Sequence, residues 1–525
     1  MYPVLTHEAL EKLLKLRFKE GFLSLRDLPL PDTFKDMQKA TQRIIHAIQN
    51  KEKITIIGDY DVDGVISTTL MRLFFEEIKY PVEWVIPNRF KDGYGLSVNI
   101  VSQIKGTDLA ITVDNGISAV YAAKLCKEEG IELIITDHHL LAPEIPEAYA
   151  IINQKQEECS FPYADVCGAQ IAWYLIASLK NTLNIKINMI SYMELVSIAI
   201  IADMMPLQHI NRVMVQVGIK SLCVSTKPAI RAFLEHYQKK VLTSEDIAFF
   251  LAPLLNSAGR MEDASYAVDF LSSTDIHDAN VKLERLIAFN SHRKTTEQTL
   301  THQALLQVNS EDDVIIAVGQ EWHEGVVGIV AARIAQICQK PSIILSENSK
   351  GVLKGSGRSF GECDLFGIVN SCREHLDKFG GHQAAIGLTL QKEKLEWFKS
   401  QIQKKYRSRD YNQEISDSQI MGELSFSQIN FELTALIKRY EPYGFGNPVP
   451  KFITNDVEIL QIQNMGKEGE HLRFLLKQDN IVLQAVWFKS KAIFKVGQKI
   501  QFVYTVNENH FRGKITLQLM IDKII

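Results

Sequence analysis

Several features that would restrict the function of this chain are missing from its sequence. The seven cysteines form no CxxC pair, which argues against a structural zinc site or a disulfide framework and fits a reducing compartment. No apolar run approaches the roughly 20 residues that a membrane-spanning helix needs. The first residues, MYPVLTHEALEKLLKL, lack the charged-then-apolar layout of a signal peptide. We therefore expect a cytoplasmic protein that does not enter a membrane.

The sequence also has little net charge, with 58 basic and 62 acidic side chains giving a formal charge of −4. This balance provides no overall attraction for a polyanion, so a surface that binds nucleic acid must be a local basic patch. The sequence contains no internal repeats and no low-complexity tracts. Its 525 residues are 46% hydrophobic and 23% charged, which is typical of a globular protein with roughly three or four domains.

One stretch organises the rest of the chain: ITIIGDYDVDG, residues 54–64. Its apolar run predicts a buried strand that ends at Gly58, and the apolar run that follows the stretch predicts a helix. Asp59, Asp61 and Asp63 lie between the two, where their carboxylates repel one another unless a cation binds them. For this stretch taken alone, an acidic surface turn or a helix cap is the alternative.

Three further segments place polar side chains after apolar runs or inside them. Asp114 follows LAITV, while Asp137, His138 and His139 follow ELIIT. Asp203 interrupts the apolar segment SIAIIADMMPL, where an unpaired carboxylate is costly. Neighbouring parallel strands end at one edge of a sheet, so we expect these side chains to meet there as ligands of a hard metal ion. Each segment alone also fits a helix cap or a buried, satisfied histidine.

Apolar runs alternate with helical stretches between residues 53 and 153, which predicts a parallel sheet with helices on both faces. The expected strands are KITIIG, VEWVIP, LAITV, ELIIT and YAIIN. Residues 167–205 add helices, and the second of them carries Asp203 to the same edge. Residues 226–310 are predicted to be helical, and the pattern over 278–308 is too long for an ordinary globular helix. We expect that helix to bridge two domains, the second of which is another α/β unit.

Several polar residues outside the acidic segments lie in turns or glycine-containing segments. Arg89 precedes a Gly-X-Gly turn near the same sheet edge, and Arg260 lies in LNSAGRM, whose small residues allow close backbone approach. GSGRS is predicted to be a Gly-rich loop in which backbone N–H groups, a hydroxyl and a guanidinium cradle a phosphate. Its candidate residues are Ser356, Gly357 and Arg358. Solvated or ion-paired side chains are the alternative for the three arginines.

The last part of the chain predicts a small closed β-barrel of the OB type. Short alternating strands such as HLRFLLK, IVLQAVWF, KIQFVYTV and KITLQLMI follow the Gly/Pro-rich turn EPYGFGNPVP. Residues 451–525 hold 11 Lys and Arg against 7 Asp and Glu, a local net charge of +4. Aromatic rings are interleaved with these bases, as a stacking platform for single strands requires, but we expect only one or two of them to contact bases. They are Phe474, Trp487, Phe488, Phe502, Tyr504 and Phe511.

The order DYDVDG, VDNG, DHH and an isolated Asp resembles motifs one to four of the DHH phosphoesterase superfamily. HEGVVGIVAARI and FGGHQAAIGL, which contains a GGHxxAxG pattern, resemble the DHH-associated domain, with His382 near its cleft. With the barrel, these segments are similar to the RecJ family of bacterial exonucleases within that superfamily. The resemblance implies an α/β protein whose parallel-sheet catalytic domain is joined by a long helix to a second α/β domain, followed by an OB-type barrel.

The resemblance also implies a division of the chain. We expect an N-terminal helical segment over residues 1–50 and a DHH catalytic domain over 51–225. A helical region with the connecting long helix follows over 226–310. The DHH-associated domain is expected over 311–410 and the OB domain, which binds nucleic acid, over 411–525.

Aspartates and a histidine without cysteine favour hard or borderline cations, and five carboxylates can hold two such ions about 3.5–4 Å apart. The expected ions are Mn²⁺ or Mg²⁺. By resemblance, the ligands of one ion are Asp59 and Asp61, and those of the other are Asp63, His138 and Asp203. Asp114 is expected to bridge the two ions.

The activity implied by the family is degradation of single-stranded DNA in the 5′→3′ direction to 5′ mononucleotides, in DNA repair and recombination. His139 is the candidate for contacting the scissile phosphate, and Arg260 for contacting the strand. Arg89, Ser356 and Arg358 are expected to hold the 5′-terminal phosphate. The expected partners are single-stranded DNA, a helicase and a single-strand-binding protein, and we expect a monomer.

Two other functions remain open from the sequence. A DHH-type phosphodiesterase could act on short oligonucleotides or cyclic dinucleotides, although such substrates need no basic, aromatic barrel. A non-catalytic DNA-binding subunit of the replisome could share this fold, although such a protein has no need of the complete set of metal ligands.

Overall fold

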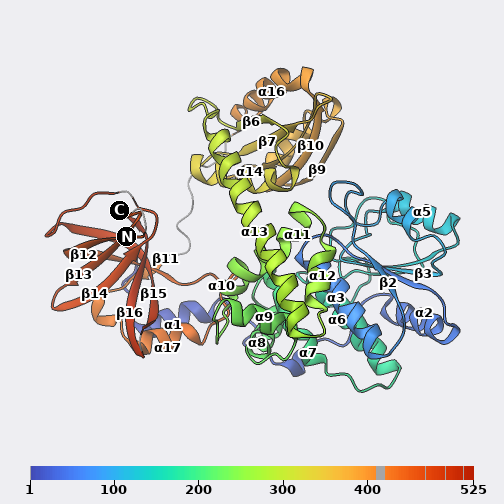
Figure 1. The fold of residues 1–525 in the computed structure, drawn as a ribbon. Coiled ribbons are helices and arrows are strands. Elements are labelled where there is room, and N and C mark those ends of the chain that lie inside the picture. The colour runs from blue at the N-terminus through green and yellow to red at the C-terminus, as the bar shows by residue number, and fades with distance from the viewer. Residues whose placement is uncertain (1, 410–419, 467–468, 491, 512) are drawn as a thin grey trace.

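The described residues fold around three β-sheets, which Figure 1 shows in three bodies joined by a helical region. This computed structural model describes residues 2–409, 420–466, 469–490, 492–511 and 513–525. Within these ranges, no helix is both long enough and apolar enough to cross a membrane.

The first sheet has the predicted parallel arrangement, in the order β2-β1-β3-β4-β5. Its strands are β1 (Ile54–Ile57), β2 (Glu83–Val85), β3 (Leu109–Val113), β4 (Glu132–Thr136) and β5 (Ala150–Ile152). Side chains alternate between two apolar cores, so Ile56 and Ile57 face opposite ways. One face packs against α2 (Met37–Asn50), α3 (Val62–Glu77) and α6 (Gly168–Thr182), and the other against α4 (Val98–Gln103) and α5 (Val120–Glu128). Both faces are therefore covered, which explains why these strands are apolar runs.

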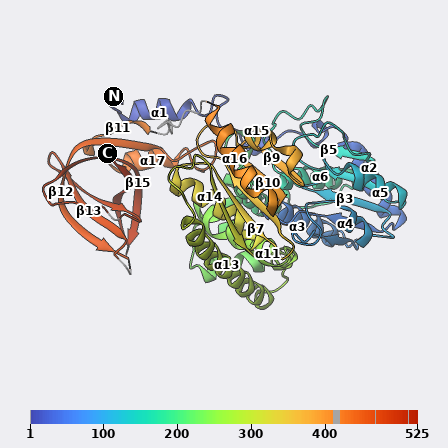
Figure 2. The ribbon, with the colours of Figure 1, turned by 90° about the horizontal axis from the view of Figure 1, so that it is seen from above.

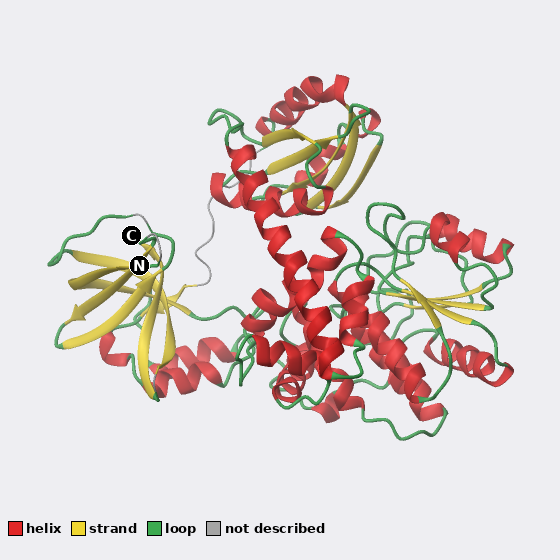
Figure 3. Ribbon diagram, viewed as in Figure 1, coloured by secondary structure: helices red, strands yellow, loops and turns green. Residues whose placement is uncertain are grey.

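A helical region extends the larger of these two cores without interruption. It comprises α7 (Met189–Ala202), α8 (His209–Cys223), α9 (Pro228–His236), α10 (Ser244–Asp246), a π-helical turn (Ile247–Leu251), α11 (Ala252–Met261), α12 (Ser265–Leu271) and α13 (Ile276–Leu305). The long helix α13 places Leu283 in this core and Leu300 in the core of the next domain. The predicted bridging helix is therefore confirmed, and Figure 3 shows it running between the first two sheets.

The second sheet is mixed, in the order β6-β7-β8-β10-β9, with only β6 and β7 parallel. Its elements are β6 (Ile315–Gln320), α14 (Glu324–Cys338), β7 (Ser342–Glu347), β8 (Val352–Arg358), α15 (Leu365–Asn370), β9 (Lys378–His382), β10 (Ala385–Gln391) and α16 (Leu395–Arg407).

The prediction of a Gly-rich loop over 355–359 is wrong, because Gly355 to Arg358 belong to β8, which pairs with β7 on one side and β10 on the other. The glycines of β8 instead allow neighbouring atoms to pack closely against this strand. A Cβ on Gly355 would lie 2.0 Å from the carbonyl oxygen of Ile344, and one on Gly357 would lie 2.7 Å from Cγ1 of Ile386.

The third sheet closes into the predicted barrel, because β12 pairs with both β13 and β15 at the ends of the order β12-β13-β14-β16-β15. The strands are β11 (Ile420–Glu423), β12 (Lys451–Met465), β13 (His471–Gln478), β14 (Ile481–Trp487), β15 (Lys499–Phe511) and β16 (Lys514–Ile524), with α17 (Phe431–Lys438) beside them. Phe474, Phe502 and Tyr504 are buried in the barrel core and Trp487 is half-buried, while Phe488 is 53% exposed. The side chain of Phe511 lies outside what the structure describes.

The first 50 residues are shared between two cores and do not form a unit of their own. Leu10 and Leu14 of α1 (His7–Lys15) are buried with the barrel, whereas α2 packs under the first sheet. Figures 1 and 2 both show α1 beside α17, close to the barrel. The N-terminal segment therefore connects the barrel to the part of the chain that contains the first sheet.

Candidate metal centre

The candidate centre lies at the carboxyl ends of β1, β3 and β4, which are neighbours in the first sheet. Asp114 and Asp137 come directly after β3 and β4, and Asp59 is separated from β1 by Gly58 alone, so the topology brings them to one edge, as predicted. The chain turns sharply from Asp59 into α3, and Gly64 allows this turn. A Cβ on Gly64 would lie only 2.4 Å from the carbonyl oxygen of Asp59.

Asp61 and Asp63 are both fixed by backbone N–H groups at helix starts. Asp61 caps α3, because its Oδ1 accepts from the N–H of Asp63 at 2.9 Å and of Gly64 at 3.2 Å. Asp63 is buried and accepts from the first N–H groups of α6, those of Gly168 at 2.6 Å and Ala169 at 2.8 Å. Burial, with the charge of Asp61, raises the pKa of Asp63 to about 6.

His138 is the meeting point of three carboxylates. Its Nε2 lies 3.2 Å from Oδ1 of Asp114, 3.7 Å from Oδ2 of Asp63 and 3.6 Å from Oδ2 of Asp203. Burial lowers the pKa of His138 to about 3, so its imidazole is neutral and has a lone pair to offer. The structure therefore gathers these four predicted residues around one point.

Asp203 arrives from the other side of the pocket, at the end of α7. The negative end of the α7 dipole disfavours a carboxylate at this position. Burial first, and then the charges of Asp63 and Asp61, raise the pKa of Asp203 to about 8. Its side chain is 27% exposed, so this ligand faces the open side of the centre.

The residues present fit a pair of divalent cations. Both carboxylate oxygens of Asp59, together with Oδ1 of Asp114 and Oδ2 of Asp203, are buried without a hydrogen-bond partner among the described residues. Burial, with neighbouring carboxylates, raises the pKa of Asp59 and of Asp114 well above the usual range. Such a cluster is costly unless cations neutralise it.

The possible ligand atoms form three overlapping groups, within each of which all atoms lie within 4.8 Å of one another. One group is Asp59, Asp61 and Asp114, a second is Asp63, His138 and Asp203, and a third is Asp114, His138 and His139. Asp114 approaches the second group through His138. Carboxylate oxygens with one imidazole suit Mg²⁺ or Mn²⁺.

The second histidine of the pair, His139, differs from His138 in its pKa because of Asp137. Asp137 Oδ1 accepts from Nδ1 of His139 at 2.7 Å. Burial lowers the pKa of His139, but this bond together with the charges of Asp137, Asp61 and Asp203 outweighs burial and raises the pKa to about 9. Asp137 also accepts from the N–H groups of His138, His139 and Ile117. Asp137 is not in the predicted ligand set, and its oxygens are occupied in holding the two histidines and the N–H of Ile117.

Three of the predicted arginines lie beside this centre. Arg89 stacks its guanidinium 4.1 Å above the ring of Tyr60, and its Nε is buried without a partner among the described residues. Burial, together with the positive charges of Arg89, Arg293 and Arg358, lowers the pKa of Arg260 to about 10, while the charge of Asp61 opposes this shift. Arg260 therefore lies between the acidic centre and the second α/β domain.

Ser356 and Arg358 contact each other through their side chains, and the charge of Arg358 acts on Arg260. Arg358 donates to Oγ of Ser356 at 2.7 Å, and Ser356 donates to the carbonyl of Ile386 at 3.0 Å. The strand pairing of β8 uses the backbone of Gly357, so that residue cannot cradle an anion as predicted. His382 is exposed at the end of β9, and its Nδ1 accepts from the N–H of Ala384. No described contact joins His382 to the arginines.

Two supporting residues were not singled out by sequence reasoning. Asn115 is fully buried, donates to the carbonyls of Ile57 and Val113, and accepts from the N–H of Leu96, so it ties the ends of β1 and β3 together. Its place directly after Asp114 was the available signal. Gly168 begins α6 so close to Asp114 that a Cβ would lie 2.5 Å from the Asp114 Cβ.

Comparison with known proteins identifies each part of the chain. Residues 53–200 match the DHH family, N-terminal domain, residues 311–408 the DHHA1 domain, and residues 420–523 the RecJ OB domain. The chain is 31% identical to the single-stranded-DNA-specific exonuclease RecJ of Haemophilus influenzae, covering 99% of this chain and 96% of that protein. It is 32% identical to the RecJ of Escherichia coli, over 93% of this chain and 90% of that protein. It is also 32% identical to the RecJ of Bacillus subtilis, but spans only 65% of that protein's length.

Solved structures show the same fold. RecJ from Thermus thermophilus in complex with Mn²⁺ has a TM-score of 0.83 at 24% identity, covering 99% of this chain and 79% of that chain. An exonuclease RecJ bound to manganese has a TM-score of 0.64 at 27% identity, covering 74% of this chain and 97% of that chain. The family expected from the motifs is confirmed: the chain belongs to the RecJ family of DHH phosphoesterases.

Proposed function

We propose that this chain is a metal-dependent exonuclease that degrades single-stranded DNA in the 5′→3′ direction and releases 5′ mononucleotides. The observation that carries the proposal is the position of two groups of ligand atoms beside a cluster of arginines. Relatives that match over nearly their full length are named single-stranded-DNA-specific exonucleases. The Thermus thermophilus relative has been solved with Mn²⁺ and with Mg²⁺.

We assign Asp59 and Asp61 to one cation and Asp63, His138 and Asp203 to the other, with Asp114 between them. When bound, such a pair of Mn²⁺ or Mg²⁺ ions lowers the pKa of water and neutralises charge that develops on phosphate oxygens. The protein's part is to hold the carboxylates close together. The strand ends, the capped start of α3 and the N–H groups of α6 do this.

His139 is placed to contact the scissile phosphate. Its raised pKa keeps the imidazole protonated at neutral pH, so it offers a positive charge and an N–H donor. Asp137 fixes its orientation through Nδ1, and 47% of the His139 side chain is exposed on the open side of the centre. Its role is to bind an oxygen of the phosphate as negative charge develops there.

Direction follows from the arginine pocket. Arg89 and Arg358, with the hydroxyl of Ser356, would hold a terminal 5′ phosphate, and Arg260 would hold the next part of the strand. A strand anchored in this way presents its first inward phosphodiester to the acidic residues. Cleavage at that bond releases a 5′ mononucleotide.

The barrel would supply affinity for a long single strand. Phe488 is the exposed ring among the predicted aromatics whose side chains are described, and it packs edge-on to His471, with centroids 4.9 Å apart. Together with the local positive charge it provides a stacking platform. We expect the enzyme to act as a monomer in the cytoplasm, on strands exposed by a helicase and coated by a single-strand-binding protein.

Neither alternative function accounts for both the barrel and the acidic cluster. A phosphodiesterase for very short substrates has no use for a closed basic barrel, and a non-catalytic DNA-binding subunit has no use for two complete groups of metal ligands.

The test is digestion of a single strand that carries a label at one end or the other, with Mn²⁺. A 5′ label should appear at once as mononucleotide, while a 3′ label should remain on shortening strands. Asp114→Asn should abolish both the release of the 5′ label and the shortening of the 3′-labelled strand. Glu129→Gln, a control in an exposed pair with Lys105, should change neither process. Early loss of the 3′ label, or cleavage of a dinucleotide faster than a long strand, would contradict the proposal.

A further inference from the structure

Asp203 is held in place differently from the other proposed ligands, because it begins a turn, residues 203–208. Asp59 and Asp114 follow strands of the first sheet, and Asp61 and Asp63 are held by helix starts within the same core. Asp203 is the last residue before the chain leaves α7, and Met204 takes a left-handed conformation with φ 54°. Three backbone bonds close the helix end: the N–H of Asp203 donates to Ala199, that of Met204 to Ile201 and that of Met205 to Ile200.

Beyond Met205 the turn is held from the barrel side of the molecule. The N–H of Leu207 donates to the carbonyl of Phe445 at 2.8 Å, and Nε2 of Gln208 donates to the carbonyl of Gly446 at 2.8 Å. Both acceptors lie in the segment that precedes the first long strand of the barrel. The second half of the Asp203 turn, beyond Met205, is thus tied to a segment more than 200 residues further along the chain.

That segment, residues 441–448 with the sequence EPYGFGNP, we call the clamp loop. Asn447 braces it from inside, because its buried amide donates to the carbonyls of Tyr440 and Pro442 while its backbone pairs with Gly444. Arg17 adds bonds from the N-terminal segment to Asn447 Oδ1 and to the carbonyl of Pro448. The clamp loop is therefore a preformed turn.

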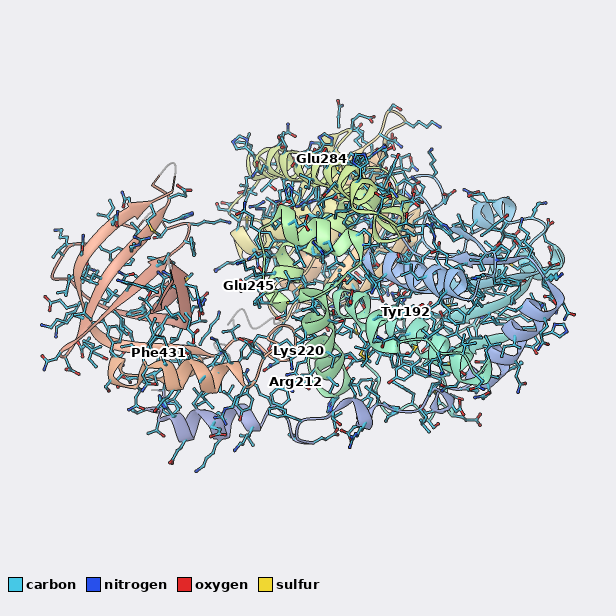
Figure 4. The ribbon with its side chains drawn as sticks, turned by 60° about the horizontal axis from the view of Figure 1, so that its bottom comes forward. Tyr192, Arg212, Lys220, Glu245, Glu284 and Phe431 are labelled. Atoms are coloured by element: carbon cyan, nitrogen blue, oxygen red, sulfur yellow. The ribbon has the colours of Figure 1, made fainter. Side chains whose placement is uncertain are left out.

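Helix α8, which begins directly after the Asp203 turn, holds the other side of the clamp loop. Arg212 is buried and donates to the carbonyls of Arg439 and Glu441, and its guanidinium lies 4.1 Å from the ring centroid of Phe22. Gln216 donates to the same carbonyl of Glu441 at 2.8 Å. Figure 4 labels Arg212 where α8 meets the N-terminal segment and the chain leading from α17.

Glycine allows the clamp loop to touch the Asp203 turn. Gly446 has φ +73°, and a Cβ added there would lie 2.8 Å from Cβ of Pro206 and 3.0 Å from its Cα. Pro206 also connects the turn to the rest of the centre through hydrogen bonds. The carbonyl of Pro206 accepts from Asn211, which in turn accepts from Gln170 near the start of α6, the helix that binds Asp63.

We infer that the clamp loop is a positioning element for the metal centre: it fixes the turn that carries Asp203 and so sets the affinity of the site that contains Asp63, His138 and Asp203. The inference rests on the proposed function for the identity of these ligands. Residues that orient a metal ligand from outside the coordination sphere typically contribute 10–100-fold to metal affinity. The clamp loop is not a catalytic group, because none of its described contacts reaches the ligand atoms.

The test compares Gly446→Ala with Gly351→Ala. Gly351 has the same φ of +73°, but a Cβ there would meet nothing within 4 Å, so both variants introduce the same backbone strain and only one pushes on Pro206. Calorimetric titration of the metal-free proteins with Mn²⁺ alone should show about tenfold weaker binding at one of two sites in Gly446→Ala. Gly351→Ala should bind as the wild type does.

Two further readouts separate positioning from a general loss of stability. In the metal-free protein, the amide hydrogen of Leu207 should exchange faster in Gly446→Ala, and binding of a single strand in EDTA should stay within twofold of the control. Excess Mn²⁺ should restore the rate of strand degradation. Faster exchange at Leu207 with unchanged affinity at both Mn²⁺ sites would overturn the inference.

A second variant decides the question if Gly446→Ala does not fold. Gln208→Ala removes a single hydrogen bond to the clamp loop and should weaken one Mn²⁺ site by about threefold. Wild-type affinity in a folded Gln208→Ala would then overturn the inference. If the wild type binds two Mn²⁺ but leaves single strands intact, the proposed function fails while this comparison stands. If the wild type binds no Mn²⁺, both fail.

Discussion

Gly168→Ala should damage catalysis much more than it damages the fold. The added Cβ would lie 2.5 Å from Cβ and 2.6 Å from Oδ1 of Asp114, whereas carbon atoms pack at about 3.5–4.0 Å. Either Asp114 or the start of α6 must therefore move by about 1 Å. Because α6 also binds Asp63 through the N–H groups of Gly168 and Ala169, either movement displaces a metal ligand.

A misplacement of this size costs about 100-fold in rate, or about 2.7 kcal/mol of transition-state stabilisation. Overpacking lowers the free energy of unfolding by about 1–3 kcal/mol. The higher helix propensity of alanine offsets roughly 1 kcal/mol of this loss. We therefore expect kcat/KM on single-stranded DNA to fall about 100-fold in saturating Mn²⁺, with a small decrease in the metal-free unfolding temperature.

The matched control is Gly319→Ala, whose Cβ would lie 1.9 Å from Cε2 of Trp322, far along the chain in β6. This clash is at least as severe, so Gly319→Ala should destabilise the protein comparably and still bind Mn²⁺ like the wild type. A folded Gly168→Ala that keeps kcat/KM within threefold of the wild type would refute the reasoning.

Three other outcomes are expected. Arg358→Gln should lower kcat/KM about tenfold or more on strands with a 5′ phosphate, because it removes a charged hydrogen bond, and equal losses on 5′-OH strands would contradict the phosphate pocket. The metal-free protein should lose stability in urea as pH rises from 5 to 8, because the raised pKa values of Asp63 (about 6) and Asp203 (about 8) mean that the folded state keeps protons that the unfolded state releases. Mn²⁺ should abolish this slope, and a flat profile without metal would count against the charge cluster. Phe488→Ala should weaken binding of a long single strand by about tenfold, since stacking on one ring contributes about 1–3 kcal/mol, while cleavage of a trinucleotide stays unchanged; equal loss on both substrates would remove Phe488 from the strand path.

The edge where the acidic residues meet could be predicted because the carboxyl ends of parallel strands all lie at the same edge of a sheet. An apolar run followed by Asp59, and another followed by Asp114, must end on the same side of the sheet when the strands are neighbours. The length of α13 likewise indicated a helix shared by two domains. Both inferences use patterns that are local in the chain.

Features that depend on contacts between distant segments were not predictable in this way. The glycines around Ser356 look like a loop in sequence, but their small size serves the packing of β7 and β10 against a central strand. Asp137 has the same place after its strand as Asp114, and only the positions of nearby N–H groups turn it into a support for His139. Phe502 and Tyr504 are two residues apart on β15 and so face the same side, and closure of the barrel makes that side the core.

The central claim is that the carboxylates at this sheet edge are held together by two divalent cations. The most direct measurement is an anomalous difference map from crystals grown with Mn²⁺. The account predicts two peaks about 3.5–4 Å apart, one beside Asp59 and Asp61 and the other beside Asp63, His138 and Asp203, with Asp114 between them. A single peak, or peaks elsewhere with these carboxylates turned toward solvent, would contradict it.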